Sequence, residues 1–538
     1  MKRLLAIMLL VAFIPCIARG DEAWVDDHVF LRRNAKIKVE DIEAEEQNVE
    51  LTSLDFPLQV YEQEGELLHV EAGWVLASDA LRIDEAVEYY AAYVKDHPKD
   101  AGGWCLRGMV DWSQEKPDDA LADFSHAIHV DPKLMAAYRW RAGIRFEQDD
   151  FDKAIADCDT LLGLDPKNAG ALAIRGRACT VQKKFDRAIE DLTRASELEP
   201  ENGWPLYYRG IAWRDKGELQ KAVADFDRAI ETGLGEAEVY YERGLAEFAL
   251  ERYADAAEDF DTAIQFGRTD ADTYGRCAQA YSRDGQYAPA IVAWTMAIAE
   301  APKRPELFHE RAVCWRQAGE LDRAIEDHTR GIERGVADAA AYYSRGYVWS
   351  MKENWNRAIA DFGQAIKLDP SDAEVFRHRG IAWHAKREFD KALGDYEQAI
   401  KLKPDAGALY EARARVWVLR GDYEKAIADL TQATRLDPKW SDAFNGLAWL
   451  QATCPVDKFR NGTLAVFNAT TACNLEEWKE TAPFDTLAAA WAEAGDFAAA
   501  ARWQQKAIDV ADAADRAELT ERLKLYRSGQ RYRTRPKP

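Results

Sequence analysis

The sequence predicts a mainly α-helical solenoid made of helical hairpins, preceded by a small all-β region. Two observations support the solenoid. Variants of the pattern Asp/Glu-x-Ala-Ile-x-Asp-Phe recur every 34 residues over ten units, and apolar residues within a unit are spaced three and four apart. A fixed period of this length indicates one supersecondary unit copied end to end, with each copy burying its apolar face against its neighbours. One alanine per unit marks the phase: Ala120, Ala154, Ala188, Ala222, Ala256, Ala290, Ala324, Ala358, Ala392 and Ala426.

Residues 373–406 show what one unit contains. Their apolar and small residues fall into two blocks at helical spacing, which predicts two helices of about 13 residues joined by a short turn. Gly380 and Ala392 are small because the two helices must approach closely there, and Pro404 ends the second helix. This combination resembles the tetratricopeptide repeat (TPR), over residues 101–510. The resemblance implies a right-handed superhelix that binds a protein or peptide in its concave groove.

The first twenty residues have the features of a secretory signal peptide. Basic residues precede an apolar stretch from Leu4 to Ile14, and small residues stand before a cleavage site that we place after Gly20. The apolar stretch is too short to span a membrane, and Pro15 makes Cys16 a poor fit for lipoprotein processing. We therefore expect segment 1–20 to be removed from an exported protein, periplasmic or extracellular, with no integral membrane segment after cleavage.

Residues 21–80 lack the 34-residue period, and their short β-prone runs predict a small β-barrel. The second half, with Gly73-Trp74-Val75, resembles the bacterial SH3-like domain. Such a domain implies contact with cell-wall material or another protein; the alternative is a structural cap on the first turn of the solenoid. Residues 81–100 then form a capping half-repeat in phase with the array. The β-prone runs are Val29–Leu31, Ile37–Val39, Leu58–Tyr61, Leu67–Val70 and Trp74–Val75.

The C-terminal end departs from the regular register. Leu519, Leu523 and Tyr526 face inward on the predicted closing helix, and the last residues are basic. We expect this tail to be solvated near the negative end of the closing helix; the alternative is a contact with an acidic partner. The segments in order are ten 34-residue repeats (101–440), two atypical repeats (441–513), a capping helix (514–528) and a basic tail (529–538).

Nine repeats carry an arginine at their seventh position and an aspartate at their twenty-third. The remaining unit has Cys277 and Ala293, so both members are absent together. Removing one partner of a buried ion pair costs roughly 3–5 kcal/mol, so joint loss is what a bonded pair requires. We predict a structural ion pair in each repeat; the alternative, a row of arginines that binds a ligand, does not explain the joint loss. The pairs are Arg107–Asp123, Arg141–Asp157, Arg175–Asp191, Arg209–Asp225, Arg243–Asp259, Arg311–Asp327, Arg345–Asp361, Arg379–Asp395 and Arg413–Asp429.

Charge and cysteine usage argue against several classes of function. A net charge of −23 argues against general nucleic-acid binding, which needs Lys and Arg to neutralise phosphates. The sequence has no Cys-x-x-Cys, His-Glu-x-x-His or phosphate-binding glycine loop, so we expect no metal, no cofactor and no enzymatic activity. Cys454 and Cys473 are expected to be too far apart for a disulfide. Four other cysteines are expected to act as apolar fillers in packed helices: Cys158, Cys179, Cys277 and Cys314.

The predicted binding residues occupy repeat positions two, five, six, nine and twelve, which in TPR proteins line the concave groove. Tyr, Trp and Arg dominate binding hot spots; the alternative is that these side chains only pack against adjacent repeats. We interpret the chain as a non-enzymatic scaffold of the cell envelope that holds an extended peptide or partner loop, acidic or aromatic. The alternative is a tether whose SH3-like domain binds cell-wall material while the array is a spacer. The predicted groove residues are Trp204, Tyr207, Tyr208, Tyr241, Arg276, His309, Tyr343, Tyr347, Arg377, His378 and His384.

Overall fold

The computed structural model describes residues 28–33, 35, 37–38, 46–47, 57–64, 67–70, 73–479 and 481–534. The chain divides into two compact units, Met1–Thr269 and Asp270–Pro538, and each unit is described by itself. The expected signal segment, 1–20, lies outside the described residues.

The first unit begins with an antiparallel sheet whose strand order is β3-β2-β6-β5-β4-β1-β7. Val60 pairs with Val70 and Leu68 with Val75, and all four side chains are buried, so one face of the sheet is apolar. The predicted β region is confirmed; closure into a barrel and the SH3-like identity stay predictions. The strands are β1 (His28–Leu31), β2 (Ile37–Lys38), β3 (Glu46–Gln47), β4 (Leu58–Glu64), β5 (Leu67–Val70), β6 (Gly73–Leu76) and β7 (Ala80–Leu81).

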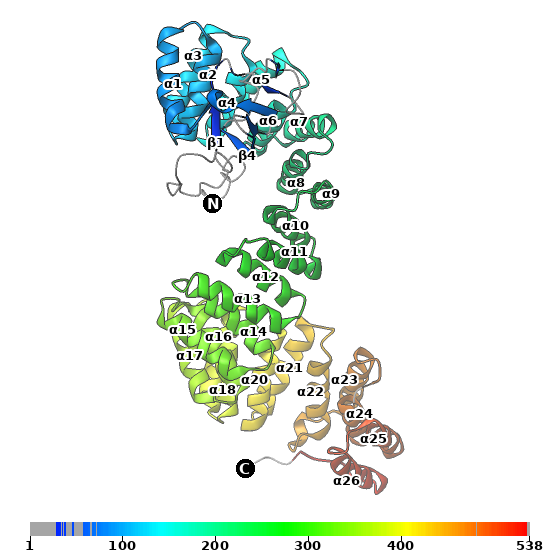
Figure 1. Cartoon of the computed structure of the whole chain (residues 1–538). Helices are drawn as coiled ribbons and strands as arrows, with labels where there is room; N and C mark the ends of the chain where they lie inside the picture. The colour runs from blue at the N-terminus through cyan, green and yellow to red at the C-terminus, as the bar shows by residue number, and fades with distance from the viewer. Residues whose placement is uncertain are drawn as a thin grey trace. The chain divides into compact units, whose positions relative to one another are not determined.

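Helical hairpins follow the sheet in the first unit (Figure 1). Consecutive helices contact one another, and each hairpin packs on the next. The helices are α1 (Ile83–Asp96), α2 (Ala101–Ser113), α3 (Pro117–Val130), α4 (Met135–Glu147), α5 (Phe151–Leu164), α6 (Ala169–Val181), α7 (Phe185–Leu198), α8 (Trp204–Lys216), α9 (Leu219–Glu231), α10 (Ala237–Ala249) and α11 (Tyr253–Gln265).

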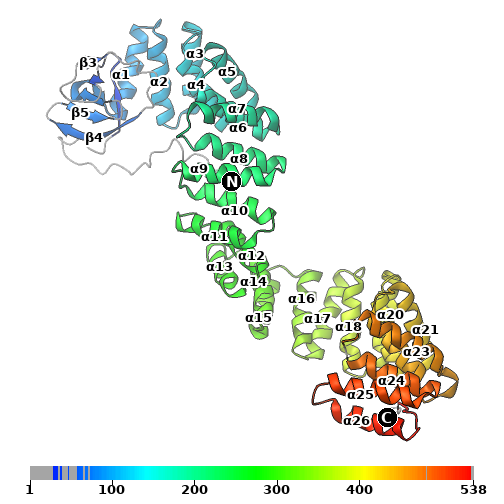
Figure 2. The ribbon, with the colours of Figure 1, turned by 90° about the vertical axis from the view of Figure 1, so that its right-hand side faces the viewer.

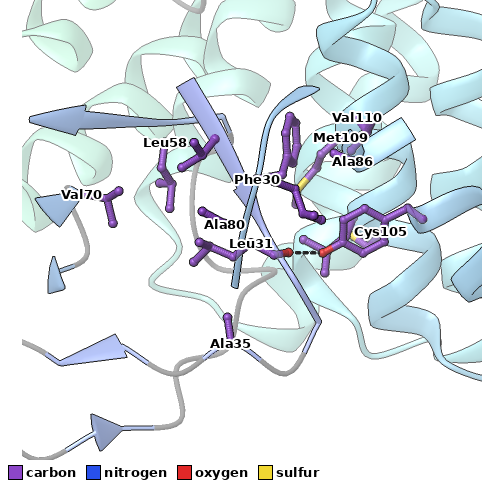
Figure 3. Packing of buried hydrophobic residues seen from close by; sticks show 14 of the residues in the cluster. Phe30, Leu31, Ala35, Leu58, Val70, Ala80, Ala86, Cys105, Met109 and Val110 are labelled. Atoms are coloured by element: carbon purple, nitrogen blue, oxygen red, sulfur yellow. Dashed lines mark hydrogen bonds between the residues drawn. The ribbon is translucent and has the colours of Figure 1, made fainter. Parts of the chain in front are cut away.

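The sheet and the first helices share one hydrophobic core. Figure 3 shows Phe30 and Leu31 from β1 beside Met109 from α2 in this core. The Tyr90 hydroxyl of α1 donates a hydrogen bond to the carbonyl of Leu31. Arg33 adds an ion pair to the helical side, with Nε 3.0 Å from a carboxylate oxygen of Asp100. The β region is therefore an integral cap on the first helices.

The second unit continues the hairpin pattern, and Figure 2 shows its helices α16, α17 and α18 side by side. Its helices are α12 (Ala271–Arg283), α13 (Tyr287–Glu300), α14 (Glu306–Gln317), α15 (Leu321–Glu333), α16 (Ala339–Met351), α17 (Trp355–Leu368), α18 (Ala373–Ala385), α19 (Phe389–Leu402), α20 (Gly407–Arg420), α21 (Tyr423–Leu436), α22 (Ser441–Thr453), α23 (Gly462–Leu475), α24 (Thr481–Ala494), α25 (Phe497–Val510) and α26 (Arg516–Arg527). The predicted TPR solenoid fold is confirmed.

A small residue on the first helix of a hairpin faces a large ring on the second. A Cβ atom added to Gly380 would lie 2.8 Å from Cε1 of Tyr396, and one added to Gly346 would lie 3.0 Å from Phe362. Tyr396 and Phe362 are fully buried. The glycine at repeat position eight is therefore required by the ring at position twenty-four, because the two helices close on each other at this point.

The nine predicted arginine–aspartate pairs are confirmed. In each pair the Nε and Nη2 groups of the arginine donate to the two oxygens of the aspartate, and the aspartate is buried. Bidentate geometry of this kind is the strongest arginine–carboxylate arrangement. The pairs join the first helix of each repeat to its second helix.

The turn inside each of the ten regular repeats contains one residue with left-handed backbone. Four are glycine, which adopts this conformation without strain, and six are not. The conformation recurs at the same 34-residue period as the sequence pattern. The residues are Glu115, Asp149, Lys183, Gly217, Glu251, Gly285, Gly319, Glu353, Arg387 and Gly421.

The two terminal repeats replace the arginine–aspartate pair with other polar contacts. Asn468 donates to Gln451 at 2.9 Å, and both residues are buried. In the last repeat Asp485 accepts hydrogen bonds from Gln504 and from Arg522 of the closing helix α26. As predicted, α26 buries Leu519, Leu523 and Tyr526. The seven cysteines of the described ranges are buried, and, as predicted, Cys454 and Cys473 form no disulfide with each other.

The described part of the basic tail, up to Thr534, is docked on the protein, which corrects the expectation of a solvated segment. Arg533 lies 2.7 Å from a carboxylate oxygen of Glu493 on α24, and the Thr534 amide donates to the Thr453 carbonyl at 3.0 Å. The Tyr532 ring lies 5.8 Å from that of Trp449. The expectation failed because Glu493 is distant in sequence and lies outside the regular repeat pattern.

Candidate functional site

The first helices of successive repeats contact one another within each unit: α4 contacts α6, α6 contacts α8, α16 contacts α18 and α18 contacts α20. Repeat positions two, five, six, nine and twelve on these helices form what we call the first-helix face. Position one is the first residue of the repeat, for example Ala373. The groove predicted from the sequence refers to these same five positions.

In the second unit the first-helix face carries a cluster of aromatic and basic side chains from three helices. The Tyr347 ring of α16 lies 5.2 Å from the His378 ring of α18, edge to face, and 6.4 Å from Tyr343. The guanidinium carbon of Arg316 on α14 lies 5.6 Å from the Tyr347 ring centre. Tyr343 also packs on the buried Phe362, which holds the cluster on the repeat core.

Arg377 and His378 form a hydrogen-bonded edge of this cluster. Arg377 Nε donates to Glu374 at 2.8 Å, and its Nη2 lies 2.9 Å from His378 Nε2. Burial first, and the Arg377 charge second, lower the pKa of His378 to about 4. His378 is therefore neutral at pH 7, and its Nε2 accepts the arginine hydrogen bond. The structure brings together four predicted residues: Tyr343, Tyr347, Arg377 and His378.

The other predicted residues of the second unit lie apart from this cluster. His309 bonds through Nδ1 to Nδ1 of the buried His328 at 2.8 Å, so its ring is held by the core. The pKa of His384 is lowered by burial and then by Arg415. Arg276 is exposed, with Nη1 3.4 Å from the Gln279 side chain.

In the first unit Trp204, Tyr207 and Tyr208 contact one another. Tyr207 is only 8% exposed and packs on Phe226, so it belongs to the core and cannot offer a broad contact surface as the sequence interpretation expected. Its position-five side chain turns toward the second helix of its own repeat. Tyr241 is partly exposed, with the Arg268 guanidinium 3.8 Å from its ring centre.

Sequence reasoning missed two arginines of the face and one aromatic residue. Arg177 lies between the rings of Phe146 and Tyr208, and Arg316 lies over Tyr347. These stacks join positions twelve, nine and six of successive repeats. A search for aromatic and basic residues 31 positions apart would have found both arginines, because 31 is the 34-residue period minus three, about one helical turn.

Over the ranges that the structure describes, no group of three or more His, Cys, Asp or Glu side chains is placed to hold a metal ion. Within the same ranges, every helix is too short or too polar to cross a membrane.

Comparison with known proteins agrees with the repeat fold. The tetratricopeptide repeat family model matches residues 105–169, 181–235, 209–271, 352–407 and 385–439. The hairpins within these matched residues are therefore tetratricopeptide repeats. Proteins built from them are generally protein–protein interaction scaffolds, and the fold is typically non-catalytic. A search of curated proteins found no match.

Several solved structures are similar to parts of the chain. YrrB, described as a TPR protein with an unusual peptide-binding site, is 25% identical, covers 37% of this chain and 99% of its own, and has a TM-score of 0.33. Yeast Tom70 is 16% identical, covers 80% and 96%, and has a TM-score of 0.36. The C-terminal part of a TPR protein from Cytophaga hutchinsonii is 18% identical, covers 45% and 99%, and has a TM-score of 0.40.

Proposed function

We propose that the protein is a non-enzymatic scaffold that binds an extended peptide or partner loop on the first-helix face of its second unit. The observation that carries this proposal is the cluster of Arg316, Tyr343, Tyr347 and His378, drawn from three successive first helices. Aromatic and arginine side chains combine large contact area with directed hydrogen bonds, which makes them frequent hot spots. The cluster spans three repeats, as a ligand that runs along the array requires.

The docked tail supports the proposal from within the molecule. Residues 530–534 have no regular secondary structure, and they bind α22 and α24, the first helices of the terminal repeats. Tyr532 stacks near Trp449, while Arg531 and Arg533 pair with Glu493. These first helices thus hold an irregular segment through one ring and one charged group, which is the mode of binding proposed for the cluster.

The test is a peptide selection followed by titration. Random peptides are selected on the full-length protein, and the Kd of the strongest is measured for the original chain and for the double variant Tyr343→Ser, Tyr347→Ser. We expect the double variant to bind at least tenfold more weakly, about 1.4 kcal/mol. Arg316→Ser serves as a milder second variant because its guanidinium touches Tyr347 and carries no structural pair in the described part of the second unit.

The control is Phe467→Ser, which removes an aromatic side chain that is 65% exposed on α23, a second helix. This variant should keep full affinity. Circular dichroism of each variant shows whether the helices are intact. Selected peptides that bind the folded double variant as tightly as the original chain, or a selection that yields no binding peptide, would refute the proposal.

We also propose that the protein is exported to the cell envelope, on the basis of residues 2–20. Mass spectrometry of native material should find a mature start near Asp21, and an intact Met1 would contradict export by this signal. In the tether alternative the SH3-like region binds cell-wall material. The core shared by β1 and α2 favours a structural cap instead, so we expect the full-length protein not to be retained on purified wall polymer.

A further inference from the structure

Arg177 of α6 lies between two aromatic rings from neighbouring first helices. Its guanidinium carbon is 4.4 Å from the ring centre of Phe146 on α4 and 4.3 Å from that of Tyr208 on α8. All three side chains are partly exposed on the first-helix face of the first unit. Phe146, Arg177 and Tyr208 occupy positions twelve, nine and six of three successive repeats. This arginine is the only one in the described residues whose guanidinium is sandwiched between rings of two different neighbouring repeats at under 4.5 Å.

Within the described ranges, Arg177 also lacks an acidic partner. Among the residues that the structure describes, no carboxylate oxygen lies within 4.0 Å of its nitrogens, and no acceptor takes a hydrogen bond from them. Burial raises the pKa of the nearby Glu147 and the Arg177 charge opposes that shift, but the two side chains form no ion pair. Three other arginines of the first-helix face are paired with acids: Arg214 with Glu242, Arg377 with Glu374 and Arg415 with Glu411.

The stack determines how a ligand can reach the guanidinium. Its five N–H donors lie in the plane of the group, so rings on both faces leave the edge as the place for binding. A carboxylate fits that edge through two parallel hydrogen bonds. Because the rings already hold the guanidinium in place, less side-chain freedom is lost when a ligand binds.

Three residues near Arg177 on the first-helix face have no polar side chain. Gly143 of α4, Ile174 of α6 and Ile211 of α8 occupy positions six and nine there, and all three are partly exposed. A ligand with a single acidic group and apolar residues on both sides therefore matches this surface better than a highly charged one.

We propose that Arg177 binds the side-chain carboxylate of one aspartate or glutamate within an extended peptide whose flanking residues are apolar. This site lies in the first unit and rests on the proposed function, since its ligand is also an extended peptide bound on the first-helix face. We assign an internal acidic residue rather than a chain end because apolar positions lie on both sides of the arginine.

The probe is the dye-labelled peptide Gly-Ser-Leu-Phe-Asp-Leu-Phe-Ser-Gly, blocked at both ends and titrated against the full-length chain by fluorescence anisotropy. A second peptide has Asn in place of Asp, and a third has Asn and a free C-terminal carboxylate. We expect the Asn peptide to bind at least tenfold more weakly than the Asp peptide. This comparison needs no change to the protein, so it does not depend on the folding of a variant.

The protein variants are Arg177→Met and Arg177→Lys. With the Asp peptide, Arg177→Met should lose at least tenfold in affinity and Arg177→Lys somewhat less, because lysine keeps the charge but not the bidentate edge. For the Asn peptide, the affinity of the Arg177→Met variant should be close to that of the original chain, because this peptide lacks the carboxylate that the arginine binds. The matched control is Arg323→Met, because Arg323 stacks at 4.6 Å on Trp315 but lies on the second helix α15.

Equal binding of the Asp and Asn peptides, unchanged affinity in Arg177→Met, or no binding of the Asp peptide overturns this inference. Stronger binding of the third peptide than of the Asp peptide overturns the internal residue in favour of a chain end. The proposed function fails separately, in the Tyr343 and Tyr347 variant with selected peptides. That test can succeed when Arg177 has no role.

Discussion

Arg345 donates two hydrogen bonds to Asp361, from Nε at 2.8 Å and from Nη2 at 2.7 Å, and a third from Nη1 to Thr329 at 3.1 Å. The first two bonds join the helices of its own repeat, and the third reaches the preceding repeat. Six arginines make this third bond, to residues at the same repeat position: Ser125, Asp159, Thr193, Asp227, Thr295 and Thr329.

Arg379 and Asp395 offer the simplest test of the pair, because Gly363 stands where other repeats supply the third acceptor. Arg379→Cys or Asp395→Ala alone should lower the free energy of unfolding by ~1–3 kcal/mol, because each leaves a buried or half-buried polar group without its partner. The double variant should recover much of that loss. Urea unfolding measures all three, and additive losses would show that the residues do not interact.

Two glycines of one repeat should respond oppositely to alanine. Gly380→Ala should destabilise by ~1–3 kcal/mol, because the added Cβ would lie 2.8 Å from the buried Tyr396 ring. Gly394→Ala should stabilise by up to ~1 kcal/mol, because Gly394 lies inside α19 with open space around it and alanine favours the helix. Thermal unfolding of both variants tests the prediction, and equal shifts of the same sign would contradict it.

Acidification should destabilise the second unit through the His309 and His328 pair. Burial, followed by the His309 charge, lowers the pKa of His328 to about 3, and burial also lowers that of His309. Both groups bind protons more readily when unfolded, so their contribution is complete above about pH 6.5 and falls as the pH is lowered; that of His328 is lost as pH falls toward 3. Each adds a slope of up to about 1.4 kcal/mol per pH unit.

Proton NMR of the histidine rings checks this expectation. His328 should stay neutral at pH 5 in the folded protein. A His97→Gln variant identifies the signal of the exposed His97, which serves as the reference ring. Titration of His328 near pH 6.5 in the folded chain would show that the pair is not buried as described.

Removal of the tail should loosen the terminal repeats. A chain truncated after Ser528 loses the Arg533 ion pair with Glu493 and the bond to the Thr453 carbonyl. We expect faster hydrogen exchange at the ends of α22 and α24, because these groups return to solvent. A chain truncated after Thr534 keeps these contacts and should exchange like the full chain. Equal exchange in both truncated chains would argue against docking.

The sequence predicted features that recur at one position of the repeat, and it missed contacts that depend on side chains of neighbouring repeats or of the irregular tail. Arg379 and Asp395 could be paired because the unit with Cys277 lacks both partners. The face residues were found by position, but position alone could not show that Tyr207 turns into the core, since that depends on the neighbouring Phe226 ring. Arg177 was missed because its partners lie one repeat away on each side. The docked tail has no periodic signal at all.

The third bond of the arginine also bears on how such an array can grow. Residues 203–236, for example, present the Arg209 guanidinium at one junction and the Asp227 acceptor at the other. A copied repeat of this kind therefore contains both the arginine donor and the hydrogen-bond acceptor. Its donor can bond to the acceptor of the repeat before it, and its acceptor can bond to the arginine of the repeat after it. Duplication of a 34-residue segment can lengthen the protein without a second mutation to repair the seam, whereas a duplicated 33-residue segment would leave the donor facing the wrong side chain.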